Sequence, residues 1–317
     1  MSKIVQPLTL VMAGLLAASP LAFSQNENQG QGQAVVTILP KKSDAAAPSV
    51  NEQTIHIEVN GKQSQLTNWQ PLRGSQANVE LVVLIDDGAR ASLGSQFEDI
   101  RQFVHSLPPN VKVSLAYMEN GRAVLSGPLS ANHAAAAQQL HLPLGAPGSS
   151  ASPYFCLSDL AKSWPSNDRS ARREVIMITD GVDYYNLRYD PEDPYVQTAI
   201  QDAAHANLVV YSIYWRNAGR VDRSEYENNA GQNLLSQVTD ATGGNSYWIG
   251  LGNPVSLQPY FEDFSLRLNN QYELGFTAPL RGKAELETLK VKVTADGVKV
   301  TAPKQTWVAP AGIASTE

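Results

Sequence analysis

The sequence predicts an α/β fold, in which an open, mostly parallel sheet is flanked by helices and carries a small antiparallel β appendage. Three continuous apolar runs, VELVVLI (79–85), REVIMITDG (173–181) and LVVYSIYW (208–215), are typical of strands buried on both faces. Segments with apolar residues at helical spacing alternate with these runs, which favours a sheet covered by helices. After residue 270 the sequence contains only alternating, strand-like patterns.

The first 24 residues have the features of a secretory signal. Lys3 supplies a positive start, residues 8–23 are apolar, and small residues lead up to Ser24. A retained membrane anchor is the alternative, but Pro20 and the polar stretch QNENQGQGQ that follows favour cleavage after Ser24. We therefore expect an exported protein, periplasmic or secreted, with no membrane span after cleavage.

Four further segments follow the signal. Residues 25–51 are rich in Gln, Asn, Ala, Ser and Pro, which predicts a flexible linker. Residues 52–77 contain TIHIEVNGKQSQL, whose alternation around Asn-Gly predicts a β-hairpin. The main α/β domain should span 78–270. Residues 271–317 should form the β appendage and a tail, and the appendage should pair with the hairpin because both are short.

The elements of the main domain follow in order from the patterns. Phe97, Ile100, Val104 and Leu107 recur at helical spacing after the first strand, and two prolines end that helix. Further strands are expected at 111–118 and 245–250 besides the apolar runs, and further helices at 131–140, 154–164, 195–206, 231–239 and 257–268.

Composition and motifs exclude several classes of function. The net charge of −6 argues against an extended basic surface for nucleic acid. Cys156 is the only cysteine, so the chain forms no internal disulfide, and we expect it to be a buried, inert thiol. The sequence contains no nucleophile elbow, zinc-protease or P-loop motif, so we do not expect an enzyme.

Two of the apolar runs end in acidic residues. The first is followed by Asp86 and Asp87, and the second by Asp180. The carboxyl ends of neighbouring parallel strands lie at one edge of a sheet, where binding sites of α/β proteins form. We therefore expect these carboxylates to share one rim of the domain.

The sequence resembles the von Willebrand factor A (VWA) domain family, and within it the bacterial secreted, VWA-related branch. The resemblance rests on VVLIDDG, LPPNVKVSLAYM, RREVIMITDG, ANLVVYSIYW, TDATGG and LNNQYELGF in this order, and spans roughly residues 79–300. It implies a VWA-like or Rossmann-like sheet and a metal-ion-dependent adhesion site that binds proteins.

That site, as the resemblance implies it, is degenerate here. Asp86 and Asp180 match the two aspartates, but Gly88 and Arg90 stand where two serines are expected, and Ser152 is the best candidate for the threonine. Mg²⁺ requires about six oxygen ligands. No metal is firmly expected, and if Mg²⁺ binds at all, Asp86, Asp180 and Ser152 would hold it.

Arg90 supports a second hypothesis. A guanidinium pairs well with carboxylates, so Arg90 could replace the metal by neutralising Asp86, Asp180 or Asp183. The alternative is that the Arg90 side chain points into solvent at the start of the next helix. Both remain open from the sequence.

The stretch DGVDYYNLRYDPEDPY (180–195) should line the same rim. Tyr184 and Tyr185 beside Asp183 suit a protein-binding surface, because aromatic anchors are enriched in interfaces. Tyrosine packing beneath the loop is the alternative. We therefore expect an exported, non-catalytic protein-binding module whose partner is unknown. The competing hypothesis is a structural or scaffolding component of a cell-envelope complex that acts through the β appendage.

Overall fold

The structure is a computed structural model of the chain. It describes residues 28–42, 50–73, 77–146, 148–188, 190–216, 225–248, 250, 252–280 and 282–310, without the side chains of residues 28, 90 and 91. The expected signal at 1–24 lies outside the described residues. No helix in the described ranges combines the length and the apolar character that crossing a membrane requires.

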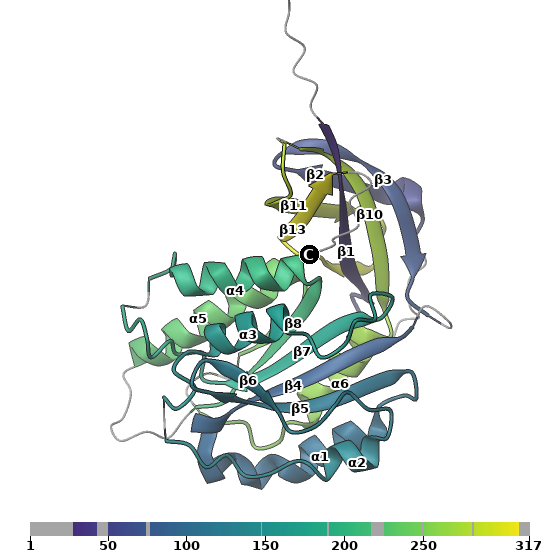
Figure 1. The fold of residues 1–317 in the computed structure, drawn as a ribbon. Helices are drawn as coiled ribbons and strands as arrows, with labels where there is room; N and C mark the ends of the chain where they lie inside the picture. Colours follow the sequence, from purple (N-terminus) through teal and green to yellow (C-terminus); the bar gives the residue numbers. More distant parts are fainter. Residues whose placement is uncertain are drawn as a thin grey trace, which may run out of the picture.

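Six antiparallel strands in the described part of the chain form a closed barrel (Figure 1). Their order around the barrel is β10, β3, β2, β11, β13 and β1, and β1 pairs again with β10 to close it. The short strand β12 (Val298–Thr301) extends the end of β1. The bounds are β1 Asn28–Pro40, β2 Ile55–Val59, β3 Lys62–Pro71, β10 Gln271–Leu280, β11 Glu285–Val293 and β13 Gln305–Pro310, with the 3₁₀ turn η1 (Glu52–Thr54) before β2.

Small residues at the inward positions of strand β1 leave the room that it needs to close the barrel. Gly30, Gly32 and Ala34 are buried, whereas the glutamines between them are exposed. A Cβ at Gly32 would collide with the ring of Phe276, so the missing side chain gives room to an aromatic ring of the neighbouring strand β10. Most of the other barrel core residues are aliphatic, and they include Val36, Ile57 and Val308.

The rest of the described chain forms a mixed six-stranded sheet in the order β6-β5-β4-β7-β8-β9. Neighbouring strands from β5 to β9 pair in parallel, and β6 pairs antiparallel with β5. The bounds are β4 Val79–Asp86, β5 Val111–Glu119, β6 Arg122–Leu125, β7 Arg172–Thr179, β8 Leu208–Tyr214 and β9 Ser246–Tyr247.

Helices cover both faces of this sheet (Figure 1). Alternate residues of β4 point to opposite faces, so Leu81, Val83 and Ile85 join one core while Val82 and Leu84 join the other. The first core is covered by α1 (Phe97–Ser106), α2 (His133–Ala137) and α6 (Gln258–Leu268); the second is covered by α3 (Pro153–Lys162), α4 (Pro194–His205) and α5 (Glu225–Thr242).

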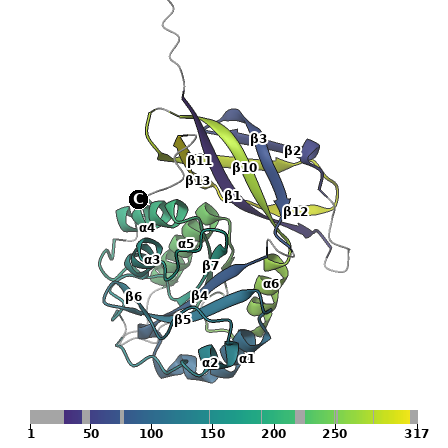
Figure 2. The same ribbon diagram turned by 45° about the vertical axis from the view of Figure 1, so that its right-hand side comes forward.

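The unit of sheet and helices, residues 78–270, is an insertion within the barrel, between β3 and β10. Its two ends lie side by side, since the Leu72 amide donates to the Gln271 carbonyl at 3.0 Å. The barrel packs against α4, α5 and α6 of the inserted unit through its strands β1, β11 and β13 (Figure 2). There Lys304 pairs with Asp240 at 2.6 Å, and His205 contacts the ring of Trp307.

These findings overturn the predicted fold class. The antiparallel part is no small appendage to an open parallel sheet; it is a closed barrel built from both ends of the described chain, beside a mixed sheet. The flexible linker predicted at 25–51 is also wrong, because it contains the thirteen-residue strand β1. Pairing between the early hairpin and the C-terminal strands is confirmed, since β3 pairs with β10 and β2 with β11.

Candidate functional site

The carboxyl ends of β4 and β7 bring the predicted acidic residues together. Ile85 and Ile178 are register partners, so Asp86 and Thr179 end adjacent strands at the same level. Asp86 is fully buried and accepts two hydrogen bonds, from the Gly88 amide at 2.8 Å and from the Thr179 hydroxyl at 2.7 Å. Asp86 therefore caps the 3₁₀ helix η3 (Asp87–Gln96) and fastens it to β7.

Thr179 connects the two acidic turns, and the sequence analysis missed it. Its hydroxyl donates to Asp86 and accepts the Gly181 amide at 3.3 Å. Asp180 is buried beside it and accepts the Val182 amide at 3.0 Å and the Tyr184 hydroxyl at 3.4 Å. The position of Thr179, directly before Asp180 at the end of a buried strand, is the signal that could have identified it.

Asp183 and Ser152 shape the next part of the same edge. Asp183 is buried and accepts the amides of Tyr185 at 2.8 Å and Asn186 at 3.2 Å. Burial raises the pKa of Asp183, and those two amides offset part of that rise. Ser152 is the N-cap of α3 and accepts the Tyr154 amide at 3.3 Å. Both side chains hold backbone turns in place.

Asp87 and Tyr154 fix the neighbouring segments. The half-buried Asp87 accepts the Leu144 amide at 3.0 Å and so holds the loop before α3 against η3. Tyr154 is buried at the start of α3 and donates to the Gly181 carbonyl at 2.7 Å. Tyr154 was not predicted from the sequence, because a tyrosine inside a helix gives no distinctive pattern.

These polar groups are a poor match to a Mg²⁺ site. Both Asp86 oxygens already accept protein hydrogen bonds, the Ser152 oxygen caps a helix, and Gly88 has no side chain. Within the described residues, no group of three or more His, Cys, Asp or Glu could hold a metal. The Arg90 side chain lies outside the described part of the structure, so its predicted pairing stays a hypothesis.

Aromatic rings gather at the exposed side of this edge. Phe155, Tyr185 and Tyr195 contact one another pairwise, with ring centroids 4.8 to 5.4 Å apart. Tyr185 is 66% exposed, while Tyr184 is half-buried. Phe155, at the start of α3, was not predicted as a site residue. The cluster assembles residues from α3, α4 and the loop after β7.

We define the carboxyl rim as the described residues of 86–96, 141–155, 179–195, 225–228 and 248–257. Among the described residues, nine large hydrophobic side chains are exposed, and seven of them lie on the carboxyl rim. Leu144 and Val255 are the most open, at 88% and 97% exposed. The other five are Leu142, Tyr185, Leu187, Tyr226 and Trp248, while Val124 and Leu266 lie elsewhere. None of the nine lies on the barrel.

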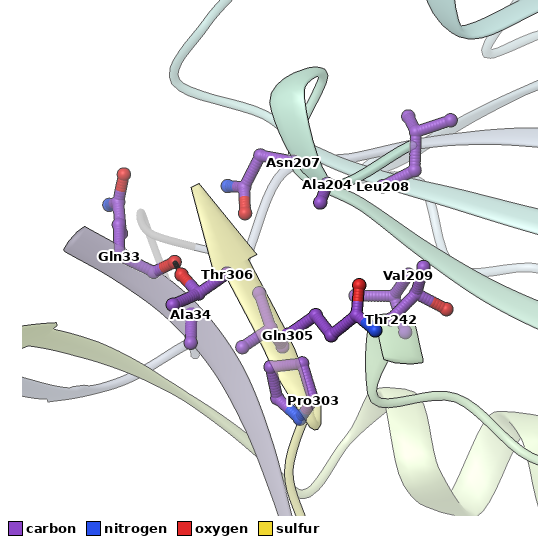
Figure 3. Close-up of a pocket in the computed structure, with 11 residues that line it drawn as sticks. Gln33, Ala34, Ala204, Asn207, Leu208, Val209, Thr242, Pro303, Gln305 and Thr306 are labelled. Carbon is purple, nitrogen blue, oxygen red and sulfur yellow. Dashed lines mark hydrogen bonds between the residues drawn. The ribbon is translucent and has the colours of Figure 1, made fainter. Parts of the chain in front are cut away.

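Two hollows lie away from the carboxyl rim. One is a polar cleft of about 20 Å³ between the barrel and the inserted unit, where Gln305 extends toward Thr242 (Figure 3). That volume suits a single water molecule rather than a ligand. The other, of about 400 Å³, lies between α1 and α6, where the rings of Phe103 and Phe261 stack 4.2 Å apart.

No family model and no curated protein matches the chain. VWA domains are among the solved structures that it resembles. An aerotolerance-related membrane protein from Bacteroides fragilis is 12% identical with a TM-score of 0.44, over 61% of this chain and 99% of that one. The SpRpn10 VWA domain is 12% identical with a TM-score of 0.37, over 59% and 95%.

A third similar structure is the ArnB paralog VWA2 from Sulfolobus acidocaldarius. It is 11% identical with a TM-score of 0.38, over 87% of this chain and 75% of that one. All three identities are low and all three TM-scores lie below 0.5, so these likenesses assign neither a site nor a function.

Proposed function

We propose that this chain is a non-catalytic protein-binding module that contacts its partner through the carboxyl rim. The observation that carries the proposal is the concentration of exposed large hydrophobic side chains on that rim, away from the barrel. Such patches commonly mark protein interaction sites. The aromatic cluster around Tyr185 would supply the anchors that dominate interface energies.

The buried acids have a positioning role in this proposal. Asp86, Asp180 and Asp183 are at most 1% exposed, so they are not free to contact a partner. Each accepts backbone amides of the loop that follows it. Loops held in this way present their exposed side chains in a fixed arrangement, which lowers the entropy lost on binding. No tightly held metal is needed for this mechanism.

A non-catalytic role agrees with the state of the lone thiol. Cys156 is fully buried, and burial raises the pKa of its thiol well above the usual range, with the charge of Asp86 adding to the effect. Such a thiol is a poor nucleophile. Export through the N-terminal signal remains part of the proposal, and would place the rim in the periplasm or outside the cell.

Matched variants distinguish this proposal from the alternative, in which the chain is a scaffolding component that makes its contacts through the barrel. Leu144→Ser with Tyr185→Ser removes two rim side chains, and the control Leu266→Ser removes an exposed leucine from α6, away from the rim. Cross-linking and affinity capture from the native cells would compare them with the wild type. We expect the rim double variant to lose its specific partners and Leu266→Ser to keep them. Retention of all partners by a folded rim variant would refute the proposal and favour the barrel.

A further inference from the structure

The junction between barrel and inserted unit is held by a buried polar cluster on β7. Arg172, the first residue of β7, is buried and donates through Nη1 to the Leu268 carbonyl at 3.0 Å and to Oε1 of Gln271. Gln271 is the first residue of the barrel strand β10, and its amide nitrogen donates to the Tyr211 hydroxyl at 3.2 Å. Gln271 therefore joins the barrel to two strands of the mixed sheet.

Glu174 lies two residues further along β7, on the same face of the sheet as Arg172. Its side chain is completely buried, and neither carboxylate oxygen has a hydrogen-bond partner among the described residues. The Nε of Arg172 is also buried without a partner in that part of the chain. An unpaired buried carboxylate is strongly unfavourable when ionised.

Among the described residues, one cation faces Glu174. Its register partners on β4 and β8 are the apolar Leu81 and Val209. Tyr211 of β8 and the neutral Gln271 of β10 also face it, and burial keeps the pKa of Tyr211 well above the usual range. On α6 the nearby charges are Arg267 and Asp263, which pair with each other at 2.6 Å. Arg172 is thus the cation that Glu174 can attract.

Burial is the main influence on the protonation of Glu174. It raises the pKa of this carboxyl to about 7, and the charge of Arg172 opposes that rise only in part. The group therefore changes charge in the physiological range.

We propose that Glu174, Arg172 and Gln271 form a proton-operated latch that sets how firmly the barrel is fastened to the inserted unit. With neutral Glu174, the Arg172 guanidinium stays bound to Leu268 and Gln271, as in the structure. With ionised Glu174, the new carboxylate competes for the same guanidinium, because charge-assisted pairing is stronger than pairing with a neutral amide. The latch is closed at lower pH and loosens as pH rises. This inference is independent of the role proposed for the carboxyl rim.

Hydrogen exchange at the junction tests the latch. The amides of Ile38 and Leu72 donate across it, to the carbonyls of Asn270 and Gln271. Their protection, corrected for intrinsic exchange rates, should fall about tenfold in the wild type between about pH 6 and about pH 8. In Glu174→Gln that pH dependence should disappear. Amides of the β2–β11 pair, which joins two barrel strands to each other, should show no such change in either protein.

A matched control is Glu80→Gln, which removes a buried carboxylate that accepts from Trp164 on the other face of the sheet. This variant should keep the wild-type pH dependence. If Glu174→Gln does not fold, the side-chain amide resonance of Gln271 in the wild type provides the test, since it should titrate with a midpoint near 7. Junction protection that is independent of pH in the wild type, or equally pH-dependent in Glu174→Gln, would overturn the latch.

Discussion

A methyl group added at Gly32 should destabilise the protein, because β1 is a strand of a closed barrel. The new Cβ would lie 2.5 Å from Cε2 of Phe276, a separation that real Cβ atoms essentially never show. Phe276 is fully buried inside the barrel, so its ring cannot swing into solvent to make room. Either the ring or the strand must shift.

The size of the effect follows from two opposing contributions. Overpacking a well-filled core by one methyl group typically costs about 1–3 kcal/mol. Replacing glycine by alanine also restricts the unfolded chain, which stabilises the folded state by about 0.4–1 kcal/mol. We therefore expect Gly32→Ala to lower the free energy of unfolding by about 1–2 kcal/mol. A flexible linker at this position would give almost no change, because the substitution would then restrict the folded and the unfolded chain alike.

Urea denaturation followed by circular dichroism measures the difference. Gly252→Ala is the matched control, because nothing lies within 4 Å of the Cβ it would add. That variant should be as stable as the wild type or slightly more stable. If Gly32→Ala matches the control, the reasoning about barrel closure is refuted.

Two further predictions concern buried polar groups. Thr179→Val keeps the side-chain shape but removes the hydroxyl that donates to Asp86 and accepts from the Gly181 amide, so the free energy of unfolding should fall by about 1.5–3 kcal/mol in urea titrations. A loss under about 0.5 kcal/mol would contradict the connecting role of Thr179. The pKa of Glu174 rises from 4.5 to about 7 on folding, so the folded state binds the proton more tightly. Its contribution to stability is full below pH 4.5 and is lost as pH rises to about 7, a difference of about 3 kcal/mol. Glu174→Gln should remove that contribution to the pH dependence, and an unchanged profile would show that another group causes it.

Individual elements of the inserted unit were predictable from local pattern. The spacing from Phe97 to Val104 predicted a helix there, and α1 spans Phe97–Ser106. The apolar run at 79–85 predicted a strand that is buried along its whole length in β4. Asp86 and Asp180 could be placed at one edge of the sheet from the sequence. The apolar runs before them are buried on both faces, as is typical of strands in a parallel sheet.

The barrel could not be predicted in the same way. The first half of strand β1, residues 29–34, alternates between exposed and buried residues, but its first inward positions are Gly30 and Gly32, which have no side chain to reveal burial. The residue that fills the space is Phe276, which is distant in sequence and pairs with Gly32 only in the folded barrel. Composition alone therefore indicated a linker.

The role of the site acids was also hidden from the sequence. Residue type and strand topology placed Asp86 and Asp180 at the edge. They did not predict that both side chains are buried, or that Asp86 accepts from Thr179 and Asp180 from Val182. Phe155 likewise becomes a neighbour of Tyr185 only once α3 has packed against α4. Such contacts depend on side-chain packing across elements, which local patterns do not encode.

The closure of the barrel by both ends of the described chain also determines an order of events during synthesis. Strand β1 is made early, yet its partners β10, β12 and β13 all lie beyond residue 270. The inserted unit at 78–270 can collapse first, because all its sheet pairings lie within it. Until the last strands are made, β1 keeps unpaired backbone edges that can join other chains. The nascent chain thus carries the unpaired edges of β1 throughout the synthesis of the inserted unit, until the barrel closes.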